Sequence, residues 1–176
     1  MLMANLNDVR KMMERLDNMT GMNGANLQFK KTRSSKILGS FVHMTQSRGG
    51  VVVKRTPVRF EFSEVILSCD ESTLWEIVKH EYAHYMATVR FQDNCHHDWR
   101  FKECCREIGA SADEPTFTNA NLEEQSRKMA KYVVTCENCG STTTFQRMCN
   151  TLRAIDNNDA TCTICGCNHF HIKTNR

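Results

Sequence analysis

The chain has 176 residues, 40% of them hydrophobic, which suits one globular domain with a small appendage. No stretch reaches the roughly 18 apolar residues of a transmembrane helix, so no membrane partner is expected. The net charge is only +3, but residues 18–60 contain eight Lys or Arg and no Asp or Glu, whereas residues 61–126 contain five basic and fourteen acidic groups. Residues 127–176 return to seven basic against three acidic groups. Clustered positive charge of this kind is typical of proteins that bind a polyanion.

The first residues predict an amphipathic helix. Apolar side chains recur at spacings of three and four between Leu2 and Met19, and Gly21 and Gly24 end the pattern. The segment lacks the features of a signal peptide, so we expect the protein to be cytoplasmic, and associated with the nucleoid if it is bacterial. In that reducing compartment the ten cysteines are expected to bind metal or to pack as small apolar side chains.

Residues 26–66 are expected to form a small antiparallel sheet. Runs of β-favouring residues are broken by glycines, and the Gly49–Gly50 pair suits a hairpin turn. Val58, Phe60 and Phe62 alternate with charged residues, which indicates a half-buried strand.

Two helices are predicted to follow this sheet. Ser68 or Asp70 can cap the first helix, which runs from Glu71 to about Phe91. After the loop QDNCHH, the second helix runs from about Asp98 to Ile108 and is closed by Gly109.

The first of these helices contains the sequence HEYAH at residues 80–84. Positions i and i+4 share one face of a helix, so the imidazoles of His80 and His84 can bind one zinc ion. Glu81 lies at the edge of that face, where its carboxylate can take a proton from a water molecule activated by the zinc. The pattern therefore predicts a zinc hydrolase with Glu81 as its general base.

A catalytic zinc site needs a third protein ligand and an open fourth position. The loop allows the second helix to face the first, so a ligand can come from the loop or from the start of that helix. Spacing alone leaves three candidates: His97, which is favoured, His96 and Glu103.

The order of HEYAH, a loop and then HDWRF resembles the SprT-like metallopeptidases, which include bacterial SprT proteins and the eukaryotic Spartan protease. The resemblance places the third ligand at His97 and matches Phe101 to an aromatic position of the family, although Asp98 stands where the family has glycine. The resemblance also matches EVILS, residues 64–68, to a strand of the family that leads into the active-site helix.

The resemblance implies a compact α+β domain that holds zinc between two helices and acts on a protein substrate. It also implies proteolysis associated with DNA, directed at DNA-bound or DNA-crosslinked proteins, which is best established for eukaryotic members. The resemblance extends over nearly the whole chain, from about residue 5 to residue 173.

Two C-x-x-C-G motifs near the end of the chain predict a structural zinc site. Four thiolates at this spacing suit a closed tetrahedral site, and each following glycine permits the turn that points backbone N–H groups at sulfur. Apolar residues around the motifs are expected to form the strands of a zinc ribbon: Tyr132, Val134, Phe145, Phe170 and Ile172. The predicted zinc ligands are Cys136, Cys139, Cys162 and Cys165.

We therefore expect a metallopeptidase domain at residues 1–121, followed by a linker helix and zinc ribbon at residues 122–176. Two zinc ions per chain are expected, one catalytic and one structural, and the protein is expected to be a monomer. DNA is expected to contact basic residues at both ends of the chain: Lys30, Lys31, Arg33, Lys36, Lys128, Lys131 and Arg147. The alternative is a non-enzymatic nucleic-acid-binding protein whose HEYAH helix holds a purely structural metal.

Overall fold

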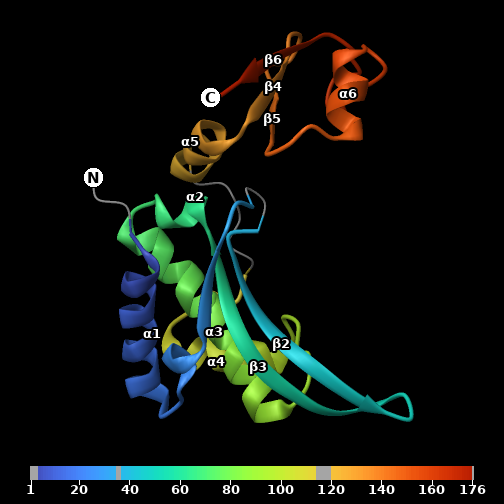
Figure 1. Cartoon of the computed structure of the whole chain (residues 1–176). Helices are drawn as coiled ribbons and strands as arrows, with labels where there is room; N and C mark the ends of the chain where they lie inside the picture. The colour runs from blue at the N-terminus through green and yellow to red at the C-terminus, as the bar shows by residue number, and fades with distance from the viewer. Residues whose placement is uncertain (1–3, 35–36, 114–119, 176) are drawn as a thin grey trace.

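The computed structural model has an α+β fold and describes residues 4–34, 37–113 and 120–175 (Figure 1). Its elements in chain order are α1 (Leu6–Thr20), the 3-10 turn η1 (Gly24–Asn26), β1 (Gln28–Thr32), β2 (Gly39–Arg48), β3 (Val51–Ser63), α2 (Glu64–Leu67), α3 (Glu71–Phe91), α4 (Trp99–Ile108), α5 (Ala120–Met129), β4 (Tyr132–Cys136), β5 (Thr142–Phe145), α6 (Asn150–Asp156) and β6 (Phe170–Thr174). The expected division between residues 121 and 122 falls at the start of α5 and stays a prediction.

The first sheet is mixed, which corrects the expectation of an antiparallel sheet. Its strand order is β1-β3-β2, with β2 antiparallel to β3 and β1 parallel to it. The central strand β3 carries Phe60 and Phe62, both fully buried. Alternation of apolar residues predicts a strand and its buried face, but it does not specify which neighbour the strand pairs with or in which direction.

The segment that follows β3 is a short helix, so the expectation of a strand at EVILS was wrong. The hydroxyl of Ser63 accepts a hydrogen bond from the Ile66 N–H, which caps α2. Val65, Ile66 and Leu67 are all buried. A short run that is apolar on every side has no period, so sequence alone cannot separate a buried strand from a buried turn of helix.

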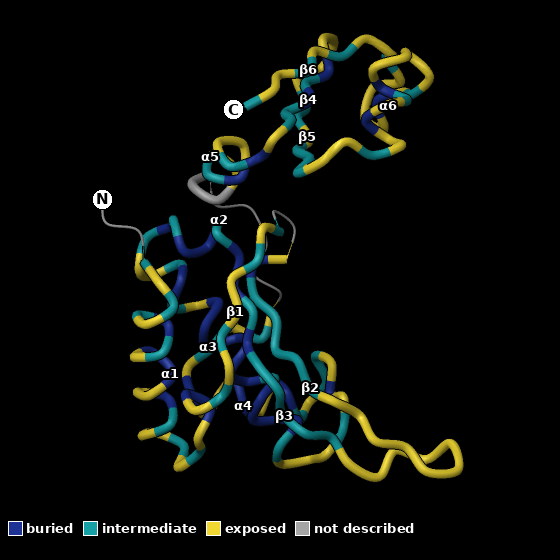
Figure 2. The backbone as a smooth tube through the Cα atoms, viewed as in Figure 1, coloured by how far each residue is buried: buried dark blue, intermediate teal, exposed yellow. Residues whose placement is uncertain are grey.

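The predicted helices at both sides of the site are confirmed. Asp70, one of the two expected caps, accepts a hydrogen bond from the Thr73 N–H at the start of α3. Asp98 caps α4 in the same way, and Gly109 ends it in the left-handed conformation with φ 63°. Gly21 likewise ends α1, with φ 70°. Helices α1 and α3 pack against one face of the mixed sheet, α4 packs against α3 and α1, and a continuous core fills the space between them (Figures 1 and 2).

The C-terminal unit is a ribbon of three antiparallel strands. The central strand β4 pairs with β5 on one edge and β6 on the other, which confirms the predicted ribbon strands. Helix α6, which the sequence analysis did not predict, lies between the two cysteine motifs and buries Leu152 and Ile155. The side chain of Asn175 donates to the carbonyls of Arg127 and Ala130 and so ties the end of β6 to α5.

Most of the cysteines outside the two motifs are packed as small buried side chains, as predicted. Cys69, Cys95, Cys104 and Cys105 are buried in the main core. In the part of the chain that the structure describes, no helix is both long enough and apolar enough to cross a membrane.

A candidate metal centre with a buried glutamate

Helix α3 brings His80, Glu81 and His84 to the floor of a cleft. His80 and His84 lie one helical turn apart, with ring centroids 5.0 Å from each other. His97 faces both from the turn just before α4, at 5.1 Å from each ring. One nitrogen from each of the three imidazoles lies within 4.8 Å of the others, so together they could hold a metal ion.

The structure places His97 in this cluster and leaves the two alternative ligands outside it. His96 is exposed, has a left-handed backbone with φ 40°, and contacts the side chain of Asn94 at 3.2 Å. Glu103 is exposed and forms an ion pair with Arg106. The turn at His96 is what directs the next residue inward.

A set of ion pairs fixes the loop that carries His97. Arg100 binds Asp93 at 2.9 Å and Asp98 at 2.7 Å, so it links the beginning of the loop to its end. Arg55 from β3 contacts Asp93 at 3.6 Å, and its backbone N–H donates to the side chain of Gln92. The loop is therefore attached both to α4 and to the sheet.

The three imidazoles are held from behind by Phe101 and Ser111. The Phe101 ring is fully buried and lies 4.3–5.1 Å from the three histidine rings, between centroids. The Nδ1 atom of His80 lies 3.4 Å from the Ser111 carbonyl. A proton on that Nδ1 places the ligating lone pair on Nε2, which is how carbonyls behind metal sites orient histidines. Burial, followed by the charges of its histidine neighbours, lowers the pKa of His84 to about 3, so the ring stays neutral, as a metal ligand must.

Glu81 is enclosed between α3 and β2. Burial raises the pKa of its carboxyl to about 7, although a hydrogen bond from the Phe41 backbone opposes the shift. Gly39 makes room for this side chain, because a Cβ there would lie 2.8 Å from Glu81 Cγ. Both residues belong to the wall of a cleft of about 410 Å³, lined by Ile37, Leu38, Gly39, Ser40, Phe41, His43, Ile77, His80, Glu81, His84, Thr88, Asn94 and His97.

We expect the two adjacent histidines to differ sharply in metal binding. His97→Ala removes one of three clustered imidazoles and should weaken zinc binding at this site by at least tenfold, the scale seen even for partners behind a metal site. His96→Asn removes an exposed imidazole outside the cluster and keeps a residue that tolerates the left-handed turn, so it should leave the affinity within about twofold of the parent. Competition with a chromophoric zinc chelator measures both, and equal losses would show that the cluster is not the binding site.

Gly39→Ala should displace the Glu81 carboxylate and leave metal binding by the three histidines unchanged. The new methyl group would also lie 2.8 Å from Ile77 Cγ2 and 3.0 Å from Glu81 Oε1, so the carboxylate must move. A displacement of about 1 Å at a reacting group lowers rates by up to about 100-fold. We expect the peptide cleavage predicted from the sequence to fall by one to two orders of magnitude, while the predicted zinc content stays at the parent level. Ser40→Ala, one residue along the same wall, is the control.

The four predicted cysteines form a second cluster at the end of the ribbon where β4 turns into β5. Their sulfurs lie within 4.8 Å of one another, with 3.6 Å between Cys136 and Cys165 and 3.7 Å between Cys139 and Cys162. All four are free thiols, since a disulfide requires about 2.05 Å between sulfurs. Cys167, His169 and His171 lie outside the cluster.

Each motif turns in the way that its glycine predicts. Gly140 and Gly166 adopt left-handed backbones with φ 69° and 73°. Hydrogen bonds from the Ser141 hydroxyl and then from the N–H groups of Cys165 and Ile164 lower the pKa of Cys162 to about 6. The turn of the second motif therefore favours the thiolate form of Cys162, which is the form that binds metal.

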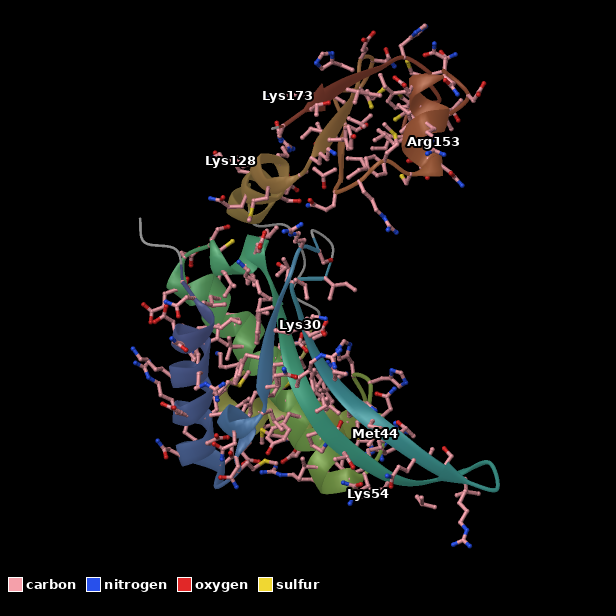
Figure 3. The ribbon with its side chains drawn as sticks, in the orientation of Figure 1. Lys30, Met44, Lys54, Lys128, Arg153 and Lys173 are labelled. Carbon is pink, nitrogen blue, oxygen red and sulfur yellow. The ribbon has the colours of Figure 1, made fainter. Side chains whose placement is uncertain are left out.

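The basic residues proposed to contact DNA lie in different electrostatic settings. Lys30 pairs with Glu61 at 3.8 Å and Lys31 with Glu64 at 3.1 Å, so both carry nearby counter-charges. Lys128 pairs with Glu124, and Lys131 lies 5.5 Å from the centre of the Tyr132 ring. Arg33 and Arg147 are exposed, whereas Lys36 lies outside the described residues. Lys30 and Lys128 belong to different parts of the fold (Figure 3).

Three residues of the site escaped the sequence analysis: Gly39, Phe41 and Ser111. They come from β2 and from the segment after α4, and they reach the histidines and Glu81 only through the tertiary fold. The β-favouring run that contains Gly39 and Phe41 signals a strand, but nothing local in the sequence signals that the strand borders the site.

Comparison with known proteins agrees with this geometry. A model of the SprT-like family matches residues 10–127. Protein SprT-like from Staphylococcus saprophyticus subsp. saprophyticus is 32% identical over 95 residues, which cover 54% of this chain and 55% of that protein. The chain thus spans about half the length of this curated relative. No solved structure gives a significant match. Because the family model covers well over half of the chain, the protein belongs to the SprT-like family.

Proposed function

We propose that this chain is a zinc-dependent endopeptidase that acts on proteins bound or crosslinked to DNA. The observation that carries the proposal is the meeting of three imidazoles and a buried glutamate in one cleft. Membership of the SprT-like family supports it.

Zinc fits both clusters by size. Zn–N bonds of about 2.05 Å in a tetrahedron separate two ligand nitrogens by about 3.4 Å, and Zn–S bonds of about 2.3 Å separate two sulfurs by about 3.8 Å. The Nε2 atoms of His84 and His97 lie 3.2 Å apart, and the paired sulfurs lie 3.6 and 3.7 Å apart. We assign His80, His84 and His97 to a catalytic zinc, and Cys136, Cys139, Cys162 and Cys165 to a structural one.

Glu81 has the properties of a general base and acid. A bound zinc ion supplies Lewis acidity, which polarises a peptide carbonyl and makes water acidic enough to attack it near neutral pH. Glu81 is buried beside the histidines, and its carboxylate takes the proton from the attacking water and passes it to the leaving amine. A cation held by the three imidazoles would oppose the rise in the pKa of Glu81 that burial causes, and so would favour its ionised form.

An extended peptide suits the other wall of the cleft. β2 is an edge strand of the sheet, and the Phe41 backbone group that bonds to Glu81 belongs to it. An unpaired strand edge can bind a peptide main chain by adding it as a further strand. This recognition does not depend on the ends of the peptide, which supports internal cleavage.

The rival reading assigns a purely structural metal to the histidine cluster. A closed structural site needs four protein ligands. Among the described residues, no cysteine, carboxylate or further histidine joins the three imidazoles. The donor set therefore supports a catalytic role rather than the rival.

We expect two zinc ions per chain and cleavage of a disordered protein that depends on the metal. Elemental analysis of zinc-replete protein should give two zinc ions per protein chain. Treatment with a chelator should abolish digestion of casein, and added zinc should restore it. Two bound zinc ions without cleavage, with or without DNA, would favour the structural rival, whereas a single zinc would contradict the assignment of two sites.

A further inference from the structure

The outer half of the β2–β3 hairpin extends beyond the body of the protein. β1 pairs with β3 only from Arg59 to Ser63, so residues 43–57 form a two-stranded ribbon with both edges unpaired. Every residue from Met44 to Lys54 is exposed. Figures 1 and 2 show this ribbon, here called the hairpin arm (residues 43–57), projecting away from the helices.

The hairpin arm exposes apolar side chains that the fold does not use. Met44 is 52% exposed, Val51 66%, Val52 41% and Val53 60%. An isolated two-stranded hairpin is marginally stable in water and gains nothing from apolar groups in solvent. Val51, Val52 and Val53 follow one another next to the hairpin turn, and exposed apolar groups gathered in this way mark a site of interaction.

The charge of the hairpin arm is entirely positive. Arg48 and Lys54 are exposed, and within the described residues neither has a carboxylate at ion-pair distance, unlike Lys30 and Lys31. Gln46 pairs with Lys54 and Arg48 with Val51, which places both cations and Val51 on the same face as Met44. The surface therefore fits a partner that is anionic and also offers apolar contacts (Figure 3).

We propose that the hairpin arm binds in a groove of double-stranded DNA. The inference rests on the proposed association with DNA and assigns it a surface outside the basic residues named from the sequence. A two-stranded β-ribbon fits the major groove, where cations reach phosphates and apolar side chains reach thymine methyl groups. Residues 43–57 contain no Phe, Tyr or Trp, so the arm lacks the stacking platforms that single strands require. Two bulges in the pairing increase the right-handed twist with which a ribbon follows a groove.

Two double variants of the zinc-loaded full chain test this assignment. Arg48→Gln with Lys54→Gln should weaken binding to a labelled duplex by about tenfold at 0.1 M salt and reduce the salt slope by about 2. Val51→Thr with Val53→Thr keeps side-chain shape and strand preference but replaces an apolar methyl group by a hydroxyl at each position. It should therefore weaken binding through the loss of apolar contacts and leave the salt slope unchanged. The control is Lys11→Gln with Arg15→Gln, which removes the same charge from exposed positions of α1.

Fluorescence anisotropy across a salt series gives both quantities, and circular dichroism checks the fold. Equal binding by parent and hairpin-arm variants would overturn the inference and leave DNA association standing. If the α1 control loses as much affinity for the duplex as the Arg48 and Lys54 variant, binding depends on net charge rather than on the hairpin arm. If the parent does not bind duplex DNA, both the role of the hairpin arm and the DNA part of the proposed function are contradicted. Cleavage of casein by the same protein would still support the peptidase part. Variants that lose binding only to single strands, or only to phosphatidylserine vesicles, would also overturn the inference.

Discussion

Glu81→Gln should abolish peptide cleavage while the protein stays folded and keeps both zinc ions. Glutamine has the size of glutamate and can still accept the hydrogen bond from the Phe41 backbone, but it cannot take a proton. General acid–base groups contribute about 10²–10⁴-fold to rates, so cleavage should fall by at least 100-fold. The assay is digestion of casein, with zinc content and melting temperature measured on the same samples.

The control for this variant is Glu76→Gln. Glu76 lies on the same helix, one turn before His80, and its half-exposed side chain pairs with Lys79. The same chemical change there should leave cleavage close to the parent rate. Full activity in Glu81→Gln would contradict the proposed mechanism. Loss of zinc together with activity would instead make Glu81 part of the metal site.

Cys162→Ser should unfold the C-terminal ribbon and release one of the two zinc ions. The ribbon has only three buried apolar residues besides its metal-binding cysteines, namely Val134, Leu152 and Ile155. Burying a large apolar side chain contributes about 1.5–3 kcal/mol, whereas ordering each residue costs about 1–2 kcal/mol in backbone entropy. Structural zinc sites supply about 10–16 kcal/mol of binding free energy, so the ribbon depends on the metal.

Hydrogen exchange is the measurement that localises this effect. We expect residues 132–174 to lose protection, while α1, α3 and α4 keep theirs because they share a separate core. Cys149→Ser is the matched control, since Cys149 lies outside the cluster at the N-cap of α6, where serine is a favoured residue. Retention of two zinc ions and a protected ribbon in Cys162→Ser would refute the four-thiolate site.

The parts of the structure that sequence could predict are those with local signals. The spacing of His80 and His84, the cap at Asp70, the start of the second helix near Asp98 and the two cysteine motifs depend on residues within a few positions of each other. The choice of His97 over His96 came from the family resemblance. Spacing could not settle it, because it depends on the left-handed turn at His96.

The parts that sequence could not predict come from contacts between distant segments. Gly39 and Phe41 border Glu81 from a strand about forty residues earlier, and no local pattern records that approach. The same holds for the ion pairs of Lys30 and Lys31, whose partners lie on or next to the neighbouring strand β3. Charge counts along the chain overstate the free positive charge at those two positions.

The order of the mixed sheet has a consequence for how the chain acquires its structure during synthesis. β3 is the last of its three strands to be made, yet it lies in the middle and pairs with both others. β1 must therefore remain without a sheet partner until residues 59–63 have left the ribosome, about thirty residues later. β2 can begin by pairing across the Gly49–Gly50 turn, so the hairpin is expected to form first and β1 to dock onto its inner edge. Until that docking, the nascent chain exposes the inner edge of β3 and the apolar face of α1, which makes this interval its period of greatest risk of aggregation.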